Sequence, residues 1–147
     1  MRPTSIESRS PVQSLMPKST NTPLVDVKNL QRVLRDFATE RDWEQFHSPK
    51  NLAMALSGEV GELTEIFQWM TEAESRVATH KPEQAQAISE ELADVLLYLV
   101  RLSDVLGIDL DQAAKSKLAI NARKYPADQS KGSSKKRYLP TAEKDSP

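Results

Sequence analysis

Apolar side chains recur at intervals of three and four residues through the middle of this 147-residue chain, from residue 26 to residue 126. Side chains at that spacing share one face of an α-helix, and the segment has few of the alternating β-branched runs that are typical of strands. The flanking segments, residues 1–25 and 127–147, have no apolar periodicity. We therefore expect one all-α domain over residues 26–126 between two mobile tails.

Four helices are expected within this domain. They span, in order, residues 26 to about 41, 49 to about 70, 82 to 106, and 109 to about 125. Asp26 and Ser48 are expected to cap the first two helices at their N-termini, and Gly107 to end the third. The polar segment between the second and third helices is expected to be a surface loop.

The net charge of −1 conceals an uneven distribution. Each tail carries a charge of +2, which leaves −5 for residues 26–126. An acidic domain is a poor match for the backbone of a nucleic-acid polymer, which requires a basic face. A metal ion or a compact cationic partner fits this charge better.

Several common kinds of site lack the residues they require. The chain has no cysteine, which excludes disulfide scaffolds, thiolate zinc sites and cysteine nucleophiles, and we expect a cytoplasmic protein. Its four glycines are too scattered to form a phosphate-binding loop. The longest apolar run, residues 95–100, is far shorter than the roughly 20 residues of a membrane-spanning helix, so no membrane partner is expected.

Two of the expected helices carry carboxylates on their apolar faces. At 100° per residue, Glu59 lies in the middle of the apolar stripe of the second helix, and Glu62 lies about 60° from it. Glu91 and Asp94 have the same relation on the third helix. Burial of an unpaired carboxylate is costly, and like charges nearby raise one another's pKa. These four acids therefore require a compensating cation.

Two kinds of cation are candidates. Arg35, Arg101 or Lys117 could form buried salt bridges with the four acids, although such pairs usually form one to one. The acids also supply the oxygen ligands that Mg²⁺ prefers, and we favour a metal site. The two histidines lie in a connector and a loop, which disfavours an iron site built on Glu-x-x-His. Mg²⁺ is expected, with Mn²⁺ as the alternative, bound together with a substrate's phosphates.

Further candidates for substrate binding lie outside the acidic stripes. The fourth helix places polar groups on its inner face, where a polyphosphate would need them: Lys117, Asn121, Lys124 and Tyr125. Taken alone, these lysines could simply extend past the edge of a core. Trp43 and Trp69 flank the second helix and could sandwich a nucleobase, although most tryptophans are core residues.

Three segments of the chain together resemble a known family. They are NLAMALSGEVGELTEIFQW, SEELADVLLYLVRLSDVLGIDL and KLAINARKYP, and ERDWEQFHSPKNL extends the likeness toward the N-terminus. Over about residues 28–126 the chain is similar to the MazG-like all-α NTP pyrophosphohydrolase superfamily, and within it to the dCTP pyrophosphatase group. The resemblance implies a four-helix MazG-like bundle completed by oligomerisation, as a homotetramer built from two dimers.

The resemblance also implies a Mg²⁺-dependent enzyme that hydrolyses a nucleoside triphosphate to monophosphate and diphosphate, favouring dCTP or a modified dCTP. The residues it assigns are Glu59, Glu62, Glu91 and Asp94 to the catalytic metal, Trp43 and Trp69 to the base, and Lys117, Asn121 and Tyr125 to other substrate contacts. Lys124, on the same face of the fourth helix, is expected to steady the polyphosphate together with Lys117. Three alternatives remain: a dUTPase-like enzyme, a phosphoribosyl-ATP pyrophosphohydrolase-like enzyme, and a non-catalytic helical oligomerisation module.

Overall fold

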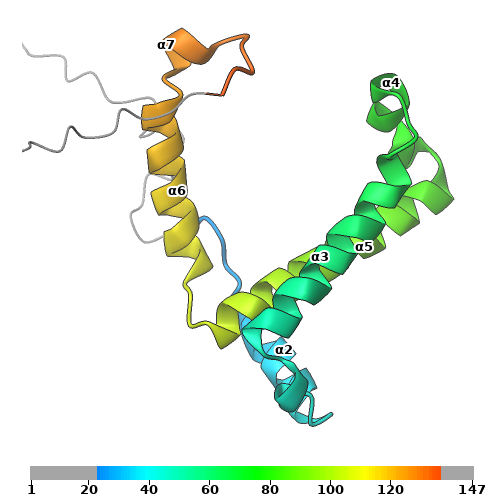
Figure 1. Cartoon of the computed structure of the whole chain (residues 1–147), viewed down its shortest axis with the longest axis vertical. Helices are drawn as coiled ribbons and strands as arrows, with labels where there is room; N and C mark the ends of the chain where they lie inside the picture. The colour runs from blue at the N-terminus through cyan, green and yellow to red at the C-terminus, as the bar shows by residue number, and fades with distance from the viewer. Residues whose placement is uncertain (1–22, 137–147) are drawn as a thin grey trace, which may run out of the picture. The chain divides into compact units, whose positions relative to one another are not determined.

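A computed structural model describes residues 23–136, and the chain forms two compact units (Figure 1). Within the described residues, one unit comprises Asp26–Leu110, and the other comprises residues 23–25 and 111–136. Within residues 23–136 the regular structure is entirely helical, which confirms the predicted all-α fold. Residues 1–22 and 137–147, which make up most of the expected mobile tails, lie outside the described residues.

The Asp26–Leu110 unit holds three of the four predicted helices. Its elements are α2 (Lys28–Thr39), η1 (Glu44–Phe46), α3 (Pro49–Phe67), α4 (Glu72–Arg76), η2 (Ala78–His80) and α5 (Pro82–Val105). The long helices α3 and α5 pack against each other along their lengths, and α2 packs against α5 (Figure 1). Leu52 of α3 and Val100 of α5 are the largest fully buried side chains among the described residues. The α3–α5 hairpin is therefore the frame of this unit.

Two of the three predicted helix caps are confirmed. The Ser48 hydroxyl accepts a hydrogen bond from the backbone N–H of Asn51, 3.2 Å away, and Pro49 follows as the first residue of α3. After α5, Gly107 adopts a φ of 67°. Its N–H donates to the carbonyl of Asp104, and the next N–H, of Ile108, donates to the carbonyl of Ser103. These two hydrogen bonds together form a Schellman motif, which favours glycine at the residue with positive φ.

Three local predictions were wrong. Asp26 is not the N-cap of the first helix, because the helix begins one residue later, with Val27 in that position and no side-chain cap. The second helix ends at Phe67 rather than near Met70. The segment expected to be a surface loop contains α4 and η2, because Thr71 and Glu74 form a reciprocal capping box that starts a short helix.

The other unit contains the fourth predicted helix, α6 (Leu110–Lys124), from its second residue onward, and a short helix α7 (Ala127–Ser130) that was not expected. Asp111, in the first turn of α6, accepts hydrogen bonds from the backbone N–H groups of Leu24 and Val25 and from Lys115. These bonds fasten the described N-terminal residues to α6. Among the described residues, no helix is both long enough and apolar enough to cross a membrane.

Candidate functional site

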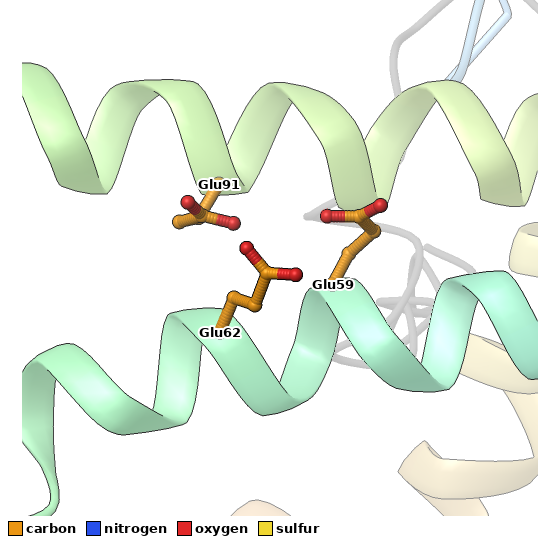
Figure 2. A group of neighbouring side chains, drawn as sticks. All are labelled: Glu59, Glu62 and Glu91. Carbon is orange, nitrogen blue, oxygen red and sulfur yellow. The ribbon is translucent and has the colours of Figure 1, made fainter.

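Three glutamates converge between the two long helices. Glu59 and Glu62 extend from α3 and Glu91 from α5, and their carboxylates point toward one another (Figure 2). Each residue offers one oxygen, and these oxygens all lie within 4.8 Å of one another. Glu59 and Glu91 are half-buried, whereas Glu62 is exposed. The packing of α3 on α5 thus brings together three of the four carboxylates that the sequence predicted as a cluster.

Local helix geometry accounts for this convergence. Residues three apart on an α-helix lie on consecutive turns of one face, so Glu59 and Glu62 share the side of α3 that meets α5. Leu52, on the same face, is buried and fixes which side of α3 turns inward. Apolar packing therefore directs two charged groups into the contact between helices.

The arrangement is electrostatically costly without a cation. The pKa of Glu59 is raised, first by desolvation and then by the charges of Glu62, Asp94 and Glu91. The pKa of Glu91 is raised by desolvation and by Glu62 and Asp94, with smaller contributions from its other acidic neighbours. In both residues the surroundings disfavour the ionised form of the carboxylate.

No basic side chain of residues 23–136 forms an ion pair with these glutamates. Arg35 and Arg101, which were candidates for that role, both pair with Asp104 instead. One oxygen of Glu91, Oε2, is buried without a hydrogen-bond partner. A set of hard oxygen donors with an unsatisfied buried carboxylate oxygen fits a divalent cation such as Mg²⁺ or Mn²⁺.

Asp94 lies on α5 one turn beyond Glu91, and its side chain is exposed. It is not one of the three residues whose oxygens lie within 4.8 Å of one another. Its charge nevertheless raises the pKa of both Glu59 and Glu91, so it lies close enough to act on them. Its assignment as a metal ligand stays a prediction.

Neither tryptophan is buried in the core. Trp43 is 44% exposed, and its ring makes edge contacts with two others: Phe37, with centroids 5.7 Å apart, and His47, with centroids 6.3 Å apart. Trp69 follows the end of α3 and is 89% exposed. Exposed indole faces are suited to stacking on a planar ligand. Their assignment to a nucleobase stays a prediction.

The predicted contacts on the fourth helix belong to the unit that contains α6. Lys117 is exposed, whereas Asn121, Lys124 and Tyr125 are half-buried. The ammonium nitrogen of Lys124 lies 5.4 Å from the centre of the Tyr125 ring. Their part in substrate binding stays a prediction.

Sequence reasoning missed the partners of Trp43. Phe37 continues the apolar spacing of the first predicted helix, yet it is 44% exposed beside Trp43. His47, whose place in the connector only argued against an iron site, accepts a hydrogen bond from Arg101. The spacing of Arg101 and Asp104, three residues apart on one helix, was the available signal for an ion pair there.

Comparison with known proteins identifies the family. A model of the MazG-like family matches residues 54–138. Human dCTP pyrophosphatase 1 is 48% identical over 115 residues, which cover 78% of this chain and 68% of that protein. The dCTP pyrophosphatase 1 of Rattus norvegicus is 46% identical over 112 residues, covering 76% of this chain and 66% of that protein.

A solved structure is also similar. The crystal structure of a pyrophosphatase from Archaeoglobus fulgidus matches with a TM-score of 0.61 and 40% identity, covering 74% of this chain and 99% of that one. The family model, the relatives and the fold agree with the family resemblance over about residues 28–126 that the sequence segments carry. The chain belongs to the MazG-like family.

Proposed function

We propose that this chain is a nucleoside triphosphate pyrophosphohydrolase that converts a (d)NTP and water to the (d)NMP and diphosphate, with dCTP or a modified dCTP as the favoured substrate. Its family and the relatives named dCTP pyrophosphatase 1 support the reaction class and the preference for dCTP. The single observation that carries the proposal is the convergence of Glu59, Glu62 and Glu91 within 4.8 Å without a basic partner among the described residues.

The proposed cofactor is Mg²⁺, with Mn²⁺ as the alternative, held by Glu59, Glu62, Glu91 and Asp94. A bound divalent ion supplies charge neutralisation for phosphate oxygens and a lowered pKa for a coordinated water. The carboxylates bring their negative charges together between α3 and α5. This cluster would fix the position of the metal ion that accompanies the triphosphate.

The remaining candidates bind the two ends of the nucleotide. Trp43 and Trp69 present exposed rings on which a base can stack. Three residues of α6 and the residue that follows it are proposed to hold the polyphosphate and sugar: Lys117, Asn121, Lys124 and Tyr125. Lysine ammonium groups and an amide are suitable partners for phosphate oxygens.

The proposal includes a homo-oligomer, a tetramer built from two dimers, in the cytoplasm. Leu92, Leu96 and Leu99 form one stripe on α5 and are 41–52% exposed. A stripe of exposed leucines on a helix favours burial against another protein surface, here a second copy. Sedimentation of the wild type should give a tetramer, and Leu96→Glu should give smaller species; a wild-type monomer would contradict this part.

The decisive experiment is a substrate panel with product analysis. Purified protein with Mg²⁺ is assayed against the common dNTPs, 5-modified dCTP, dUTP and phosphoribosyl-ATP, and diphosphate release is measured. We expect dCTP or a modified dCTP to give the highest kcat/KM. Glu62→Ala and Asp94→Ala should abolish turnover, whereas Glu83→Gln, an exposed glutamate in the first turn of α5, should retain it. No diphosphate from any nucleotide would refute the proposal.

A further inference from the structure

We propose that Arg101 is a positioning residue for an aromatic cluster formed by Phe37, Trp43 and His47, and that it acts on the Trp43 ring through a hydrogen bond to His47. The inference rests on the proposed function, in which Trp43 stacks on the nucleobase. It adds a residue that is neither a proposed metal ligand nor a proposed base-stacking residue, and it makes the alignment of the ring depend on the protonation state of His47.

Arg101 is held in place by a buried ion pair. It is 7% exposed, and one of its terminal nitrogens lies 3.1 Å from Oδ2 of Asp104, whose side chain is 8% exposed. The other oxygen of Asp104 accepts a hydrogen bond from Arg35, which lies on α2. Buried charges joined in this way keep one geometry, because separating them would leave a charge unpaired. The guanidinium is therefore a fixed point of the α2–α5 contact.

The third partner of this network is the His47 ring. The Nε–H of Arg101 donates to Nδ1 of His47 over 3.1 Å. Since a guanidinium can only donate, Nδ1 must carry a lone pair, and His47 is neutral with its proton on Nε2. Acidification that protonates Nδ1 removes the acceptor and places two positive charges side by side.

The surroundings of His47 agree with this neutral form. Its pKa is lowered by desolvation and by the charge of Arg101, while Glu44 acts in the opposite direction. Asp104 offsets part of the Arg101 charge and Arg35 pairs with Asp104 in turn. The charged groups around the ring in the described network are therefore Arg101, Glu44, Asp104 and Arg35.

The His47 ring in turn contacts Trp43. Their centroids lie 6.3 Å apart with an angle of 66° between the planes, an edge-to-face contact. Trp43 meets Phe37 in the same way, at 5.7 Å and 71°, and the guanidinium of Arg41 covers the Phe37 ring at 3.6 Å. Trp43 is thus held between two rings while 44% of it stays exposed. A ring that two neighbouring rings hold in place while much of it stays exposed is suited to stacking with little further loss of entropy.

Fluorescence of Trp43 tests the network without any nucleotide. The chain has two tryptophans, so Trp69→Phe leaves Trp43 as the only one. Protonated imidazole quenches indole emission, and we expect a pH transition with its midpoint below 6.5. Adding His47→Phe should abolish the transition, and adding Arg101→Met should move its midpoint upward, because the repelling charge is gone. An unchanged midpoint in the Arg101→Met protein would overturn the proposal.

Kinetics with dCTP separate positioning from general stabilisation. Arg101→Met should raise KM at least about fivefold, with kcat within about twofold. A fivefold change in KM corresponds to the lower end of the free energy that stacking one base contributes. Arg35→Met is the matched control, because Arg35 also pairs with Asp104 but makes no bond to His47, and its KM should stay near that of the wild type. Equal changes in KM for the two variants would mean a structural role only.

Two further outcomes are distinguishable. If circular dichroism shows that Arg101→Met does not fold, His47→Phe replaces it, since the phenyl ring keeps the contact with Trp43 and removes the acceptor. The same rise in KM is then expected, and a wild-type KM would overturn the proposal. A wild-type protein that hydrolyses no nucleotide would instead refute the proposed function, while the fluorescence transition would still test the network.

Discussion

Replacing Glu59 with glutamine should remove most of the stabilisation that Mg²⁺ gives this protein. At a free Mg²⁺ concentration 100 times its dissociation constant, binding to the folded state alone adds about 2.7 kcal/mol to the free energy of unfolding. Glutamine keeps the size of the side chain but removes the charge of one of three carboxylates whose oxygens lie within 4.8 Å. Loss of an anionic ligand should weaken binding about 100-fold or more, since the loss of a mere supporting contact already costs 10–100-fold. At the same Mg²⁺ concentration only about 0.4 kcal/mol then remains.

These free energies correspond to measurable shifts in melting temperature. The Asp26–Leu110 unit has 85 residues, a size at which 1 kcal/mol corresponds to about 4–8 °C. Wild type should therefore melt about 10–20 °C higher with Mg²⁺ than in EDTA, and Glu59→Gln only about 2–3 °C higher. In EDTA the variant should be at least as stable as wild type, because desolvation and the Glu62 charge disfavour the ionised Glu59 carboxylate.

Scanning calorimetry of the two proteins, each in EDTA and in Mg²⁺ at about 100 times the wild-type dissociation constant, measures all four melting temperatures. Glu83→Gln is the control, because it removes one exposed glutamate from the first turn of α5 and should behave as wild type. A wild-type melting temperature that does not depend on Mg²⁺ would refute the metal site. An equal Mg²⁺ shift in Glu59→Gln and wild type would refute the place of Glu59 in it.

Three further predictions concern the base, the bond that is cut and the second unit. Trp43→Ala and Trp69→Ala should each weaken nucleotide binding by about 1–3 kcal/mol while Mg²⁺ binding is retained, as measured by calorimetric titration; unchanged affinity would exclude that tryptophan from stacking. In H₂¹⁸O with Mg²⁺, attack of water at the α-phosphorus should leave the label in the monophosphate, and mass spectrometry that finds it in diphosphate or orthophosphate would contradict the mechanism. The pKa of Asp111 is lowered by its bonds to Lys115 and to the backbone of Val25 and Leu24, so the stabilisation it gives is present above about pH 4 and is lost as the pH falls through that lowered pKa. Hydrogen exchange at Leu24 and Val25 should accordingly be slower in wild type than in Asp111→Asn at neutral pH, and the difference should vanish in strong acid; equal rates at neutral pH would exclude the role of Asp111.

The long helices and two of their caps could be predicted because their determinants are local. Ser48 before Pro49 and Gly107 after α5 act through backbone groups a few residues away, so the sequence alone specified where α3 begins and α5 ends. The failures were also local. Thr71 and Glu74 have the spacing of a capping box, but the polarity of the segment around them favoured a surface loop. Asp26 is a favoured N-cap residue, but the first helix has Val27 at its N-cap instead.

Helical periodicity also specified which carboxylates turn toward the apolar face, because three-residue spacing and the position of Leu52 fix the side of α3 that is buried. Only the packing of α3 on α5 decided that Glu59, Glu62 and Glu91 come within 4.8 Å and that one oxygen of Glu91 is buried without a partner. The distance between two helices depends on all the side chains between them, and no single residue encodes it.

The partners of Arg101 show the same division. From the sequence, Arg101 was a candidate for a salt bridge with the four acids of the predicted metal site, and it pairs with none of the three clustered glutamates. Helix geometry places Asp104 beside it on the next turn, whereas only the tertiary structure brings His47, 54 residues away in the chain, within hydrogen-bond distance. A buried guanidinium binds whichever acceptors the packing brings within hydrogen-bond distance, and the spacing of residues along the chain does not determine that distance when they lie on different elements.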